Sequence, residues 1–197
     1  LDKYTLLSDG GFRWQNSLKE NRLALVRSSL SYNFHEKNSI ATGMGLFFSF
    51  KENKINRIEL RPFQEFIFYN QFKRIFFSNR IRLEERYFKG VTNKELSSNY
   101  NFSCRFRYRF FASIPLNNNA IADKTIFLNV GDEVFINFGK EIIYNIFDNN
   151  RIIAGLGYQV NKKISISLNY MNQFSQGNAL NSFEENDIIW LSFTQTM

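Results

Sequence analysis

The residues best suited to chemistry in this chain are arginines at every second position. The stretch CRFRYRFF, residues 104–111, spaces Arg105, Arg107 and Arg109 two residues apart, with an aromatic or small apolar residue before each. Guanidinium groups bind carboxylates and phosphates, and arginines among aromatic rings are typical of proteins that bind single-stranded nucleic acid. Which of these chemistries applies depends on the element that carries the arginines.

Alternation with period two indicates a β-strand, because only a strand sends every second side chain to the same side. On a strand the three arginines share one face, and Cys104, Phe106, Tyr108 and Phe110 share the other. Nucleic-acid binding by stacking needs the rings and the cations on the same face. The pattern therefore argues against nucleic acid as a partner and indicates a strand whose two faces meet different environments.

Composition narrows those environments. The chain has 197 residues, with 23 Phe, 2 Pro, 22% charged residues and a net charge of +7. It contains no run of about 18 to 20 apolar residues, which a membrane helix requires. The positive charge indicates an acidic partner or surface. We expect residues 1–197 to form a single domain from which any secretory signal has been removed, and one cysteine forms no internal disulfide.

Alternation of apolar and polar residues recurs along most of the chain. Ten candidate strands lie near residues 4–17, 22–34, 39–50, 58–72, 74–88, 101–116, 125–138, 146–160, 164–176 and 185–197. Most exceed the roughly five to six residues usual in soluble sheets, whereas a transmembrane β-strand needs about 9 to 11. The predicted fold is all-β: a closed, antiparallel, up-and-down transmembrane β-barrel of about 10 strands with a charged, largely filled lumen.

The connections support this prediction. We expect short turns at residues 35–38, 72–73 and 161–163, and longer loops at 51–57, 89–100 and 176–186. Outer-membrane barrels alternate short periplasmic turns with longer extracellular loops. The segment 117–124 is longer than this rule predicts for its side. With ten strands, both termini fall on the periplasmic side.

A tight turn fixes which residues of two strands lie opposite each other. If Phe72 faces Lys73, pairs of opposite charge follow: Glu65 with Arg80, Arg61 with Glu84, Glu59 with Arg86, and, across the next loop, Glu84 with Arg105. The same arithmetic puts Glu133 within reach of Arg107 or Arg109. The predicted lumenal charge network comprises Glu59, Arg61, Glu65, Arg80, Arg82, Glu84, Arg86, Arg105, Arg107, Arg109, Glu133 and Arg151.

This network must point away from lipid. An arginine or lysine facing the bilayer middle costs about 2 to 4 kcal/mol. Eight such residues would exceed the stability of an ordinary fold. Four glutamates do not neutralise eight arginines, so water, loop acids or a bound anion must supply the remainder. A structural network and an anion site in the lumen both fit.

Four residues depart from the apolar pattern of the lipid-facing side. Pro62 and Gln64 interrupt one strand, Asn79 lies diagonally from Gln64, and Asp132 follows Gly131 on another strand. A bulge that shifts the phase explains such departures and is our expectation. The alternative is contact with another protein subunit.

Catalytic residues are not apparent. The only histidine, His35, opens a short polar turn without a cysteine or carboxylate at ligand spacing beyond Glu36. Barrel enzymes of the outer membrane place a histidine beside a serine or aspartate near the extracellular rim, whereas the predicted topology puts His35 on the periplasmic side. We therefore expect no enzyme activity, no metal and no cofactor, and a lipid-modifying enzyme is an unfavoured alternative.

A soluble β-sandwich is the competing fold. In a sandwich the apolar faces of two sheets would pack together and the charged faces would meet water. The long strands and the scarcity of proline disfavour it.

Several motifs together resemble a known family. They are NRIRLEERYF (79–88), RFRYRFF (105–111), GDEVFINF (131–138), NNRIIAGLGYQV (149–160) and LNYMNQF (168–174). Over roughly residues 58–197 the chain resembles the domain of unknown function 2490 family (DUF2490), predicted outer-membrane barrels of Gram-negative, Bacteroidota-type bacteria. That resemblance implies a fold and a location in the bacterial outer membrane but no reaction.

The expected function is a non-catalytic outer-membrane barrel that serves as a structural or accessory subunit of a larger complex. Its expected partners are outer-membrane lipid, including lipopolysaccharide, and other outer-membrane proteins. A narrow pathway for anions or small solutes is the alternative.

Overall fold

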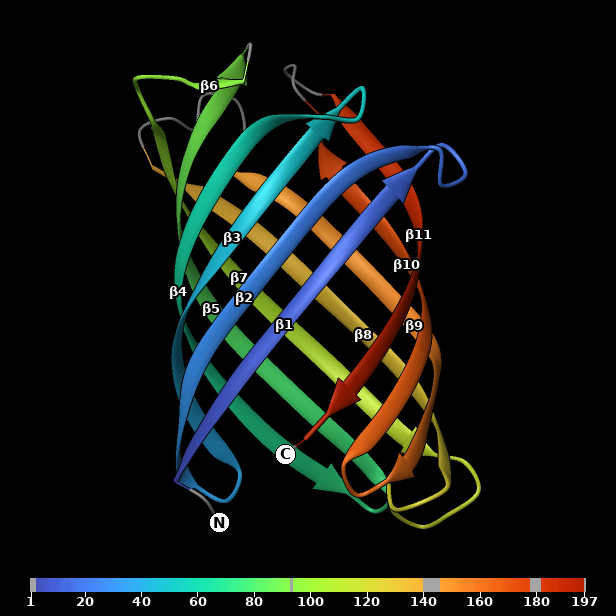
Figure 1. Ribbon diagram of the computed structural model, residues 1–197. Coiled ribbons are helices and arrows are strands. Elements are labelled where there is room, and N and C mark those ends of the chain that lie inside the picture. Colours follow the sequence, from blue (N-terminus) through green and yellow to red (C-terminus); the bar gives the residue numbers. More distant parts are fainter. Residues whose placement is uncertain (1–2, 93, 140–145, 178–181, 197) are drawn as a thin grey trace. The chain divides into compact units, whose positions relative to one another are not determined.

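A computed structural model describes residues 3–92, 94–139, 146–177 and 182–196 of the chain. These residues form β-strands and the turns between them (Figure 1). No helix long and apolar enough to cross a membrane is present in the described segments.

The strands have the following bounds: β1 Tyr4–Gln15, β2 Glu20–His35, β3 Asn38–Lys51, β4 Lys54–Phe72, β5 Ile75–Thr92, β6 Glu95–Leu96, β7 Asn101–Pro115, β8 Thr125–Phe138, β9 Phe147–Asn161, β10 Ile164–Gln176 and β11 Phe183–Gln195. The ten long strands match the ten predicted from alternation, with ends that differ by a few residues. The two-residue β6 was not predicted.

The strands are antiparallel and follow chain order in one up-and-down sheet, β1-β2-β3-β4-β5-β7-β8-β9-β10-β11, with β6 paired to β5. This confirms the predicted fold class at the level of an all-β, antiparallel, up-and-down sheet. The order begins at β1 and ends at β11, and closure of the sheet into a barrel stays a prediction.

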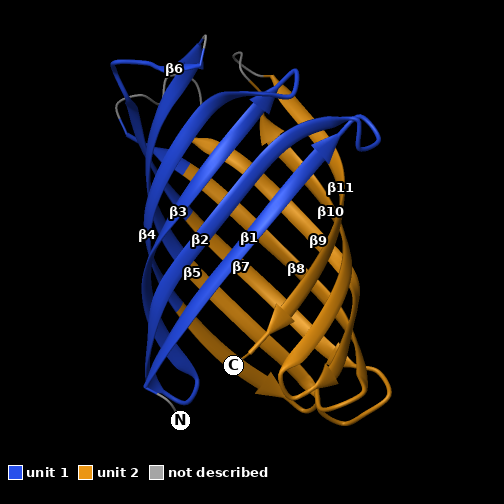
Figure 2. Ribbon diagram, in the orientation of Figure 1, with its two compact units in different colours: residues 1–66, 82–106, 137–143 blue, residues 67–81, 107–136, 144–197 orange. Residues whose placement is uncertain are grey.

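The chain divides into two compact units (Figure 2). Unit 1 comprises Leu1–Phe66, Arg82–Phe106 and Asn137–Ile143, and unit 2 comprises Ile67–Ile81, Arg107–Ile136 and Tyr144–Met197. Strands β4, β5, β7 and β8 contribute to both units. Each unit contains some of the arginines and glutamates of the predicted charge network.

Burial follows the predicted period of two. On β4, for example, every odd-numbered residue from Glu59 to Ile67 is buried, whereas the even-numbered residues between them are at least partly exposed. We call the side with the buried arginines and glutamates the charged face, and the opposite side the apolar face. Because a one-residue slip would exchange the faces, this alternation fixes the register.

Two predicted loops are shorter in the structure. β3 ends at Lys51 and β4 begins at Lys54, so the expected loop 51–57 is a turn of Glu52 and Asn53. Both residues have positive φ, 51° and 58°, as the type I′ turn of a tight hairpin requires. The loop 89–100 is also partly strand, because Val91 and Thr92 pair with Leu96 and Glu95. The expected alternation of short and long connections is therefore wrong at residues 51–57.

The turn between β4 and β5 was placed one residue too early. Lys73 and Arg74 form it, with β4 ending at Phe72 and β5 beginning at Ile75. Lys73 has a φ of 53°. A positive φ is uncommon for a residue other than glycine, so the lysine did not indicate a turn at this position. A two-residue turn moves the expected partner of each β4 residue by two positions along β5.

The expected bulge beside Asp132 is wrong. The register of β8 with β9 is continuous from Thr125 to Phe135, and the irregularity lies between Phe135 and Ile136. A Cβ atom at Gly131 would lie 2.2 Å from Cδ2 of Phe111, so this glycine makes room for a ring. On β4 the burial alternation passes Pro62 and Gln64 without a change of phase, which gives no support to a bulge there either.

Candidate functional site

Burial in this protein is inverted relative to a soluble domain. Glu84 is 0% exposed and Arg107 is 5% exposed, whereas Ile152 and Leu156 are 57% and 54% exposed. Charged residues are almost never fully buried unless they are paired, and aliphatic residues dominate ordinary cores. The charged face is therefore the face of the sheet whose side chains are shielded from solvent.

In unit 1 three guanidinium groups lie around the fully buried carboxylate of Glu84. Arg105 donates from Nε (2.8 Å) and Nη2 (2.6 Å) to Glu84 Oε2. Nη1 of Arg61 lies 3.6 Å from Glu84 Oε2, and Nη1 of Arg82 lies 3.7 Å from Oε1. Ionised donors and acceptors make the stronger hydrogen bonds, and here they replace lost hydration.

Two further carboxylates of unit 1 bind the neighbouring arginines. Arg61 and Arg86 donate from Nε to Glu59 Oε1 at 2.9 and 2.7 Å. Arg82 donates from Nε to Glu65 Oε2 at 2.7 Å. Four arginines and three glutamates of β4, β5 and β7 thus form one buried network in unit 1.

Phenylalanine rings hold the same arginines from the side. The guanidinium carbon of Arg61 lies 3.7 Å from the centre of the Phe47 ring, and that of Arg82 lies 4.3 Å from the Phe63 ring. Phe63 fits because Gly43 has no side chain: a Cβ there would lie 2.4 Å from the ring. These cation–π contacts fix the guanidinium planes and shield them from water.

Unit 2 contains a second arginine group around the carboxylate of Glu133. Oε1 of Glu133 accepts hydrogen bonds from Nη2 of Arg80 (2.6 Å) and Nη2 of Arg107 (2.7 Å). The guanidinium carbons of Arg107 and Arg151 lie 4.4 and 4.6 Å from the centre of the Phe135 ring, which is 1% exposed.

The ion pairs test the predicted register. Three predicted pairs are present although the later turn shifts the direct partners on β5 by two positions: Arg61 with Glu84 and Glu59 with Arg86 on the hairpin, and Glu84 with Arg105 across the next loop. Glu133 also binds Arg107, as expected. The bond of Glu65 to Arg82, two positions beyond the expected Arg80, follows from the later turn.

The family comparison covers nearly the whole chain. A family model described as "Protein of unknown function (DUF2490)" matches residues 2–184. The chain belongs to this family. The match begins at the first strand, whereas the motif resemblance began near residue 58, because the early strands carry an ordinary alternation without distinctive motifs. No curated protein and no solved structure matched the chain.

Four residues of this DUF2490 chain, Pro62, Gln64, Asn79 and Asp132, were predicted to interrupt the apolar face. Two of them, Asn79 and Asp132, make side-chain hydrogen bonds. Tyr108 donates its hydroxyl to Asn79 Oδ1 at 2.8 Å, and Asn79 is buried. Asn150 donates from Nδ2 to both carboxylate oxygens of Asp132 at 3.0 and 3.1 Å. Gln64 is exposed on β4, with Pro62 half-buried beside it.

Asp132 belongs to a polar row that sequence analysis missed. The registers of β8 to β11 align Asp132 with Ile152, Ile152 with Asn172, and Asn172 with Asp187, so three of the four aligned residues are polar. Asn172 donates to Asp187 at 3.2 Å and to Glu185 at 2.7 Å. In the sequence, each of these polar residues taken alone resembles the end of a strand. Aligning neighbouring strands by their apolar positions would have shown that the polar residues lie side by side.

His35 is the last residue of β2 and directly precedes the turn of Glu36 and Lys37, where the sequence predicted it. Its Nδ1 accepts a hydrogen bond from the backbone N–H of Lys37 at 3.2 Å, and its side chain is exposed. Within the described ranges no three histidine, cysteine, aspartate or glutamate residues are grouped so as to hold a metal ion.

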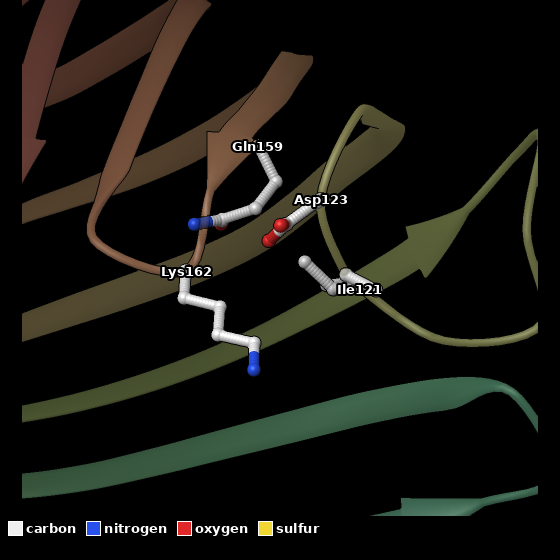
Figure 3. A pocket seen from close by; sticks show the side chains of 5 residues that line it. Ile121, Asp123, Gln159 and Lys162 are labelled. Atoms are coloured by element: carbon white, nitrogen blue, oxygen red, sulfur yellow. The ribbon is translucent and has the colours of Figure 1, made fainter.

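An open hollow of about 690 Å³ in unit 2 is lined by Ile121, Ala122, Asp123, Gln159 and Lys162 (Figure 3). It lies beside the β7–β8 loop, which is held by its own side chains. Asn117 donates to Lys124 O at 3.0 Å and accepts from the N–H of Ile126 at 2.8 Å. The hollow combines one acid, one amine and one amide, without a nucleophile and base in contact.

Proposed function

We propose that this DUF2490 member is a non-catalytic β-barrel protein of the bacterial outer membrane, with both termini in the periplasm. It serves as a structural or accessory subunit of a larger envelope complex. The observation that carries the proposal is the inverted burial: buried arginines and glutamates on one face of long strands, and exposed aliphatic and aromatic side chains on the other.

The strand lengths support a membrane location. The ten long strands run from 12 to 19 residues. About 9 to 11 tilted residues cross a bilayer. A hydrocarbon environment would cover the exposed apolar face, which is costly to leave in water at roughly 25 cal/mol per Å². Closure of the sheet would pair its end strands and leave no open edge in lipid, where unpaired backbone groups cost several kcal/mol each.

The polar row supports the role of subunit. On β8 the apolar stretch runs six residues, from Ile126 to Asp132, and on β11 it runs six residues, from Phe193 to Asp187. On the strands between, Tyr158 and Ile166 align with Ile126 and Phe193. Six residues correspond to about 20 Å along a strand, and less once tilted. The apolar band of such barrels is about 25 Å tall. A protein partner covering Asp132 and Asp187 would remove the cost of setting them in lipid, and lipid including lipopolysaccharide would cover the rest.

Cell fractionation tests this proposal. The protein, expressed behind a signal peptide for export to the periplasm, should sediment with the outer membrane and resist carbonate and high-salt extraction. Unboiled samples should migrate faster in SDS gels than boiled samples, because a closed barrel stays folded. Release into the soluble periplasmic fraction would refute the membrane location.

Single-channel recording separates the transport alternative. A bore filled by ion-paired arginines should give no resolved conductance in planar bilayers, whereas stepwise, anion-selective currents would favour a narrow pathway. A lipid-modifying enzyme would instead require activity that is lost in the His35→Ala variant.

A further inference from the structure

The connection between β7 and β8, residues 116–124, is longer than the two-residue turns at the same edge of unit 2. Those turns are residues 73–74 between β4 and β5 and residues 162–163 between β9 and β10. Binding sites are commonly placed on loops that a rigid scaffold positions. The longer connection is therefore the place at this edge where a site can be built.

Thr125, the first residue of β8, holds this loop against the sheet and is 0% exposed. Its Oγ1 accepts hydrogen bonds from Nδ2 of Asn118 at 2.7 Å and from the N–H of Ala122 at 3.0 Å. Thr125 lies opposite Gln159 and on the same face of β8 as Glu133, so the loop covers the charged face at this edge. Because these bonds lie within the chain, the loop is ordered before a ligand arrives, which lowers the cost of binding.

The hollow beside this loop has walls of opposite charge (Figure 3). Asp123 comes from the loop, and Lys162 comes from the β9–β10 turn. Among the described residues neither side chain makes an ion pair, although both line the same hollow. A carboxylate and an ammonium in contact would neutralise each other, whereas two charges held apart across a hollow are each able to bind a ligand.

Gln159 and two apolar side chains complete the lining. Gln159 donates from Nε2 to the backbone oxygens of Asn161 and Ile164 at 2.6 and 3.3 Å, which fixes its amide and leaves Oε1 as an acceptor. Ile121 and Ala122 add apolar surface. The volume of about 690 Å³ lies within the range of small-molecule sites, roughly 300 to 1,000 Å³.

We propose that this hollow binds a short peptide with free termini. The ammonium of the peptide faces Asp123, its carboxylate faces Lys162, and a peptide N–H donates to Gln159 Oε1. Opposite charges on two walls select a zwitterion, since a simple anion or cation would meet one like charge. The volume, the amide and the apolar wall favour a peptide over a single amino acid. The inference goes beyond the proposed function, because no part of the site depends on a membrane.

Nuclear magnetic resonance of the isotope-labelled, full-length protein in detergent tests the site, with trialanine as the probe. Trialanine should shift the amide signals of residues 121–123 and 159–162 in a saturable way. N-acetyl-trialanine lacks the ammonium, and trialanine amide lacks the carboxylate. Each should bind about threefold to fivefold more weakly, the loss expected for one solvent-exposed ion pair. Glycine, which has both charges but no peptide group, should also bind more weakly than trialanine.

Two variants assign each charge to one end of the peptide. Asp123→Asn should lower the affinity for trialanine about threefold to fivefold, and N-acetylation of the peptide should then cost no further affinity. Lys162→Gln should lower it by a similar factor, and amidation should then cost nothing further. The matched control is Lys163→Gln, which changes the neighbouring lysine of the same turn, outside the lining of the hollow, and should bind trialanine as the parent does.

The proposal is overturned if trialanine gives no saturable shifts, if the blocked peptides or glycine bind as tightly as trialanine, or if Lys163→Gln loses as much affinity as Lys162→Gln. Unchanged sensitivity to N-acetylation in Asp123→Asn would also overturn it. Peptide binding by a protein found in the soluble fraction would support this site and refute the membrane location, so the two failures are distinguishable.

Discussion

At the scale of the residue, the protein depends on buried carboxylates that hold arginines in place. Glu84 is fully buried and lies within 4 Å of guanidinium nitrogens of Arg61, Arg82 and Arg105. Removing one partner of a buried ion pair leaves uncompensated charge and typically costs about 3 to 5 kcal/mol. An exposed pair contributes about 0 to 1 kcal/mol.

We therefore expect Glu84→Gln to lower the free energy of unfolding by at least about 3 kcal/mol. The control is Asp9→Asn, which breaks the pair with Arg27, where the Asp9 side chain is 53% exposed; it should cost less than about 1 kcal/mol. Urea unfolding in lipid vesicles, followed by tryptophan fluorescence, measures both. Equal losses in the two variants would argue against a buried network.

The sequence was sufficient to predict most members of this network, because alternation and one turn determine which charges lie together. It did not reveal the rings beneath the guanidinium groups. Phe47, Phe63 and Phe135 were assigned to no role, since a phenylalanine on the charged face interrupts the polar pattern. Their partners depend on the room left by glycines such as Gly43, which only coordinates display.

At the scale of the element, the long strands follow from alternation, but the turns depend on backbone conformation. The turn of Lys73 and Arg74 was misplaced by one residue because neither lysine nor arginine signals a positive φ. The same limitation hid the turn of Glu52 and Asn53, whose charged and polar flanks resembled a longer loop. Glu65 binds Arg82 and not the expected Arg80, because a turn placed one residue later shifts every pairing along the hairpin by two positions.

A glycine at position 73 should stabilise the β4–β5 hairpin. The left-handed conformation costs a residue other than glycine about 1 to 2 kcal/mol, and Lys73 has a φ of 53°. We expect Lys73→Gly to raise the urea midpoint of unfolding. Lys162→Gly, in the β9–β10 turn at a residue without positive φ, should leave it unchanged or lower it through the added freedom of glycine in the unfolded chain. Stabilisation by both variants would contradict this explanation.

The polar row across β8 to β11 makes a separate prediction. Asp187→Leu should reduce the recovery of partner proteins that copurify with the chain from gently solubilised membranes, because an apolar side chain removes the acceptor a partner would bind. Ile189→Leu, two residues along the same face of β11, should leave the recovered proteins unchanged. Quantitative mass spectrometry of the purified material measures both. Identical partner recovery from the two variants would indicate that Asp187 meets lipid headgroups or water.

At the scale of the whole molecule, the sequence predicted an all-β, up-and-down antiparallel sheet because burial with period two admits few alternatives over strands this long. Membership of DUF2490 agrees with the motifs of the later strands and extends to the first. The function rests on physical argument, since the family description gives no activity.

The central claim is that the apolar face contacts hydrocarbon while the charged face does not. Two neighbouring residues of β10 test it most directly. Leu168 is 54% exposed on the apolar face. Ser167 lies on the charged face, where its hydroxyl is hydrogen-bonded to that of Ser192 at 2.6 Å. Leu168→Cys and Ser167→Cys, each in a Cys104→Ser background, are spin-labelled in lipid vesicles, and collision rates with oxygen and with a water-soluble nickel chelate are measured. The account predicts a high ratio of oxygen to nickel accessibility at position 168 and a low ratio at 167. Similar ratios at both positions, or high nickel accessibility at 168, would contradict it.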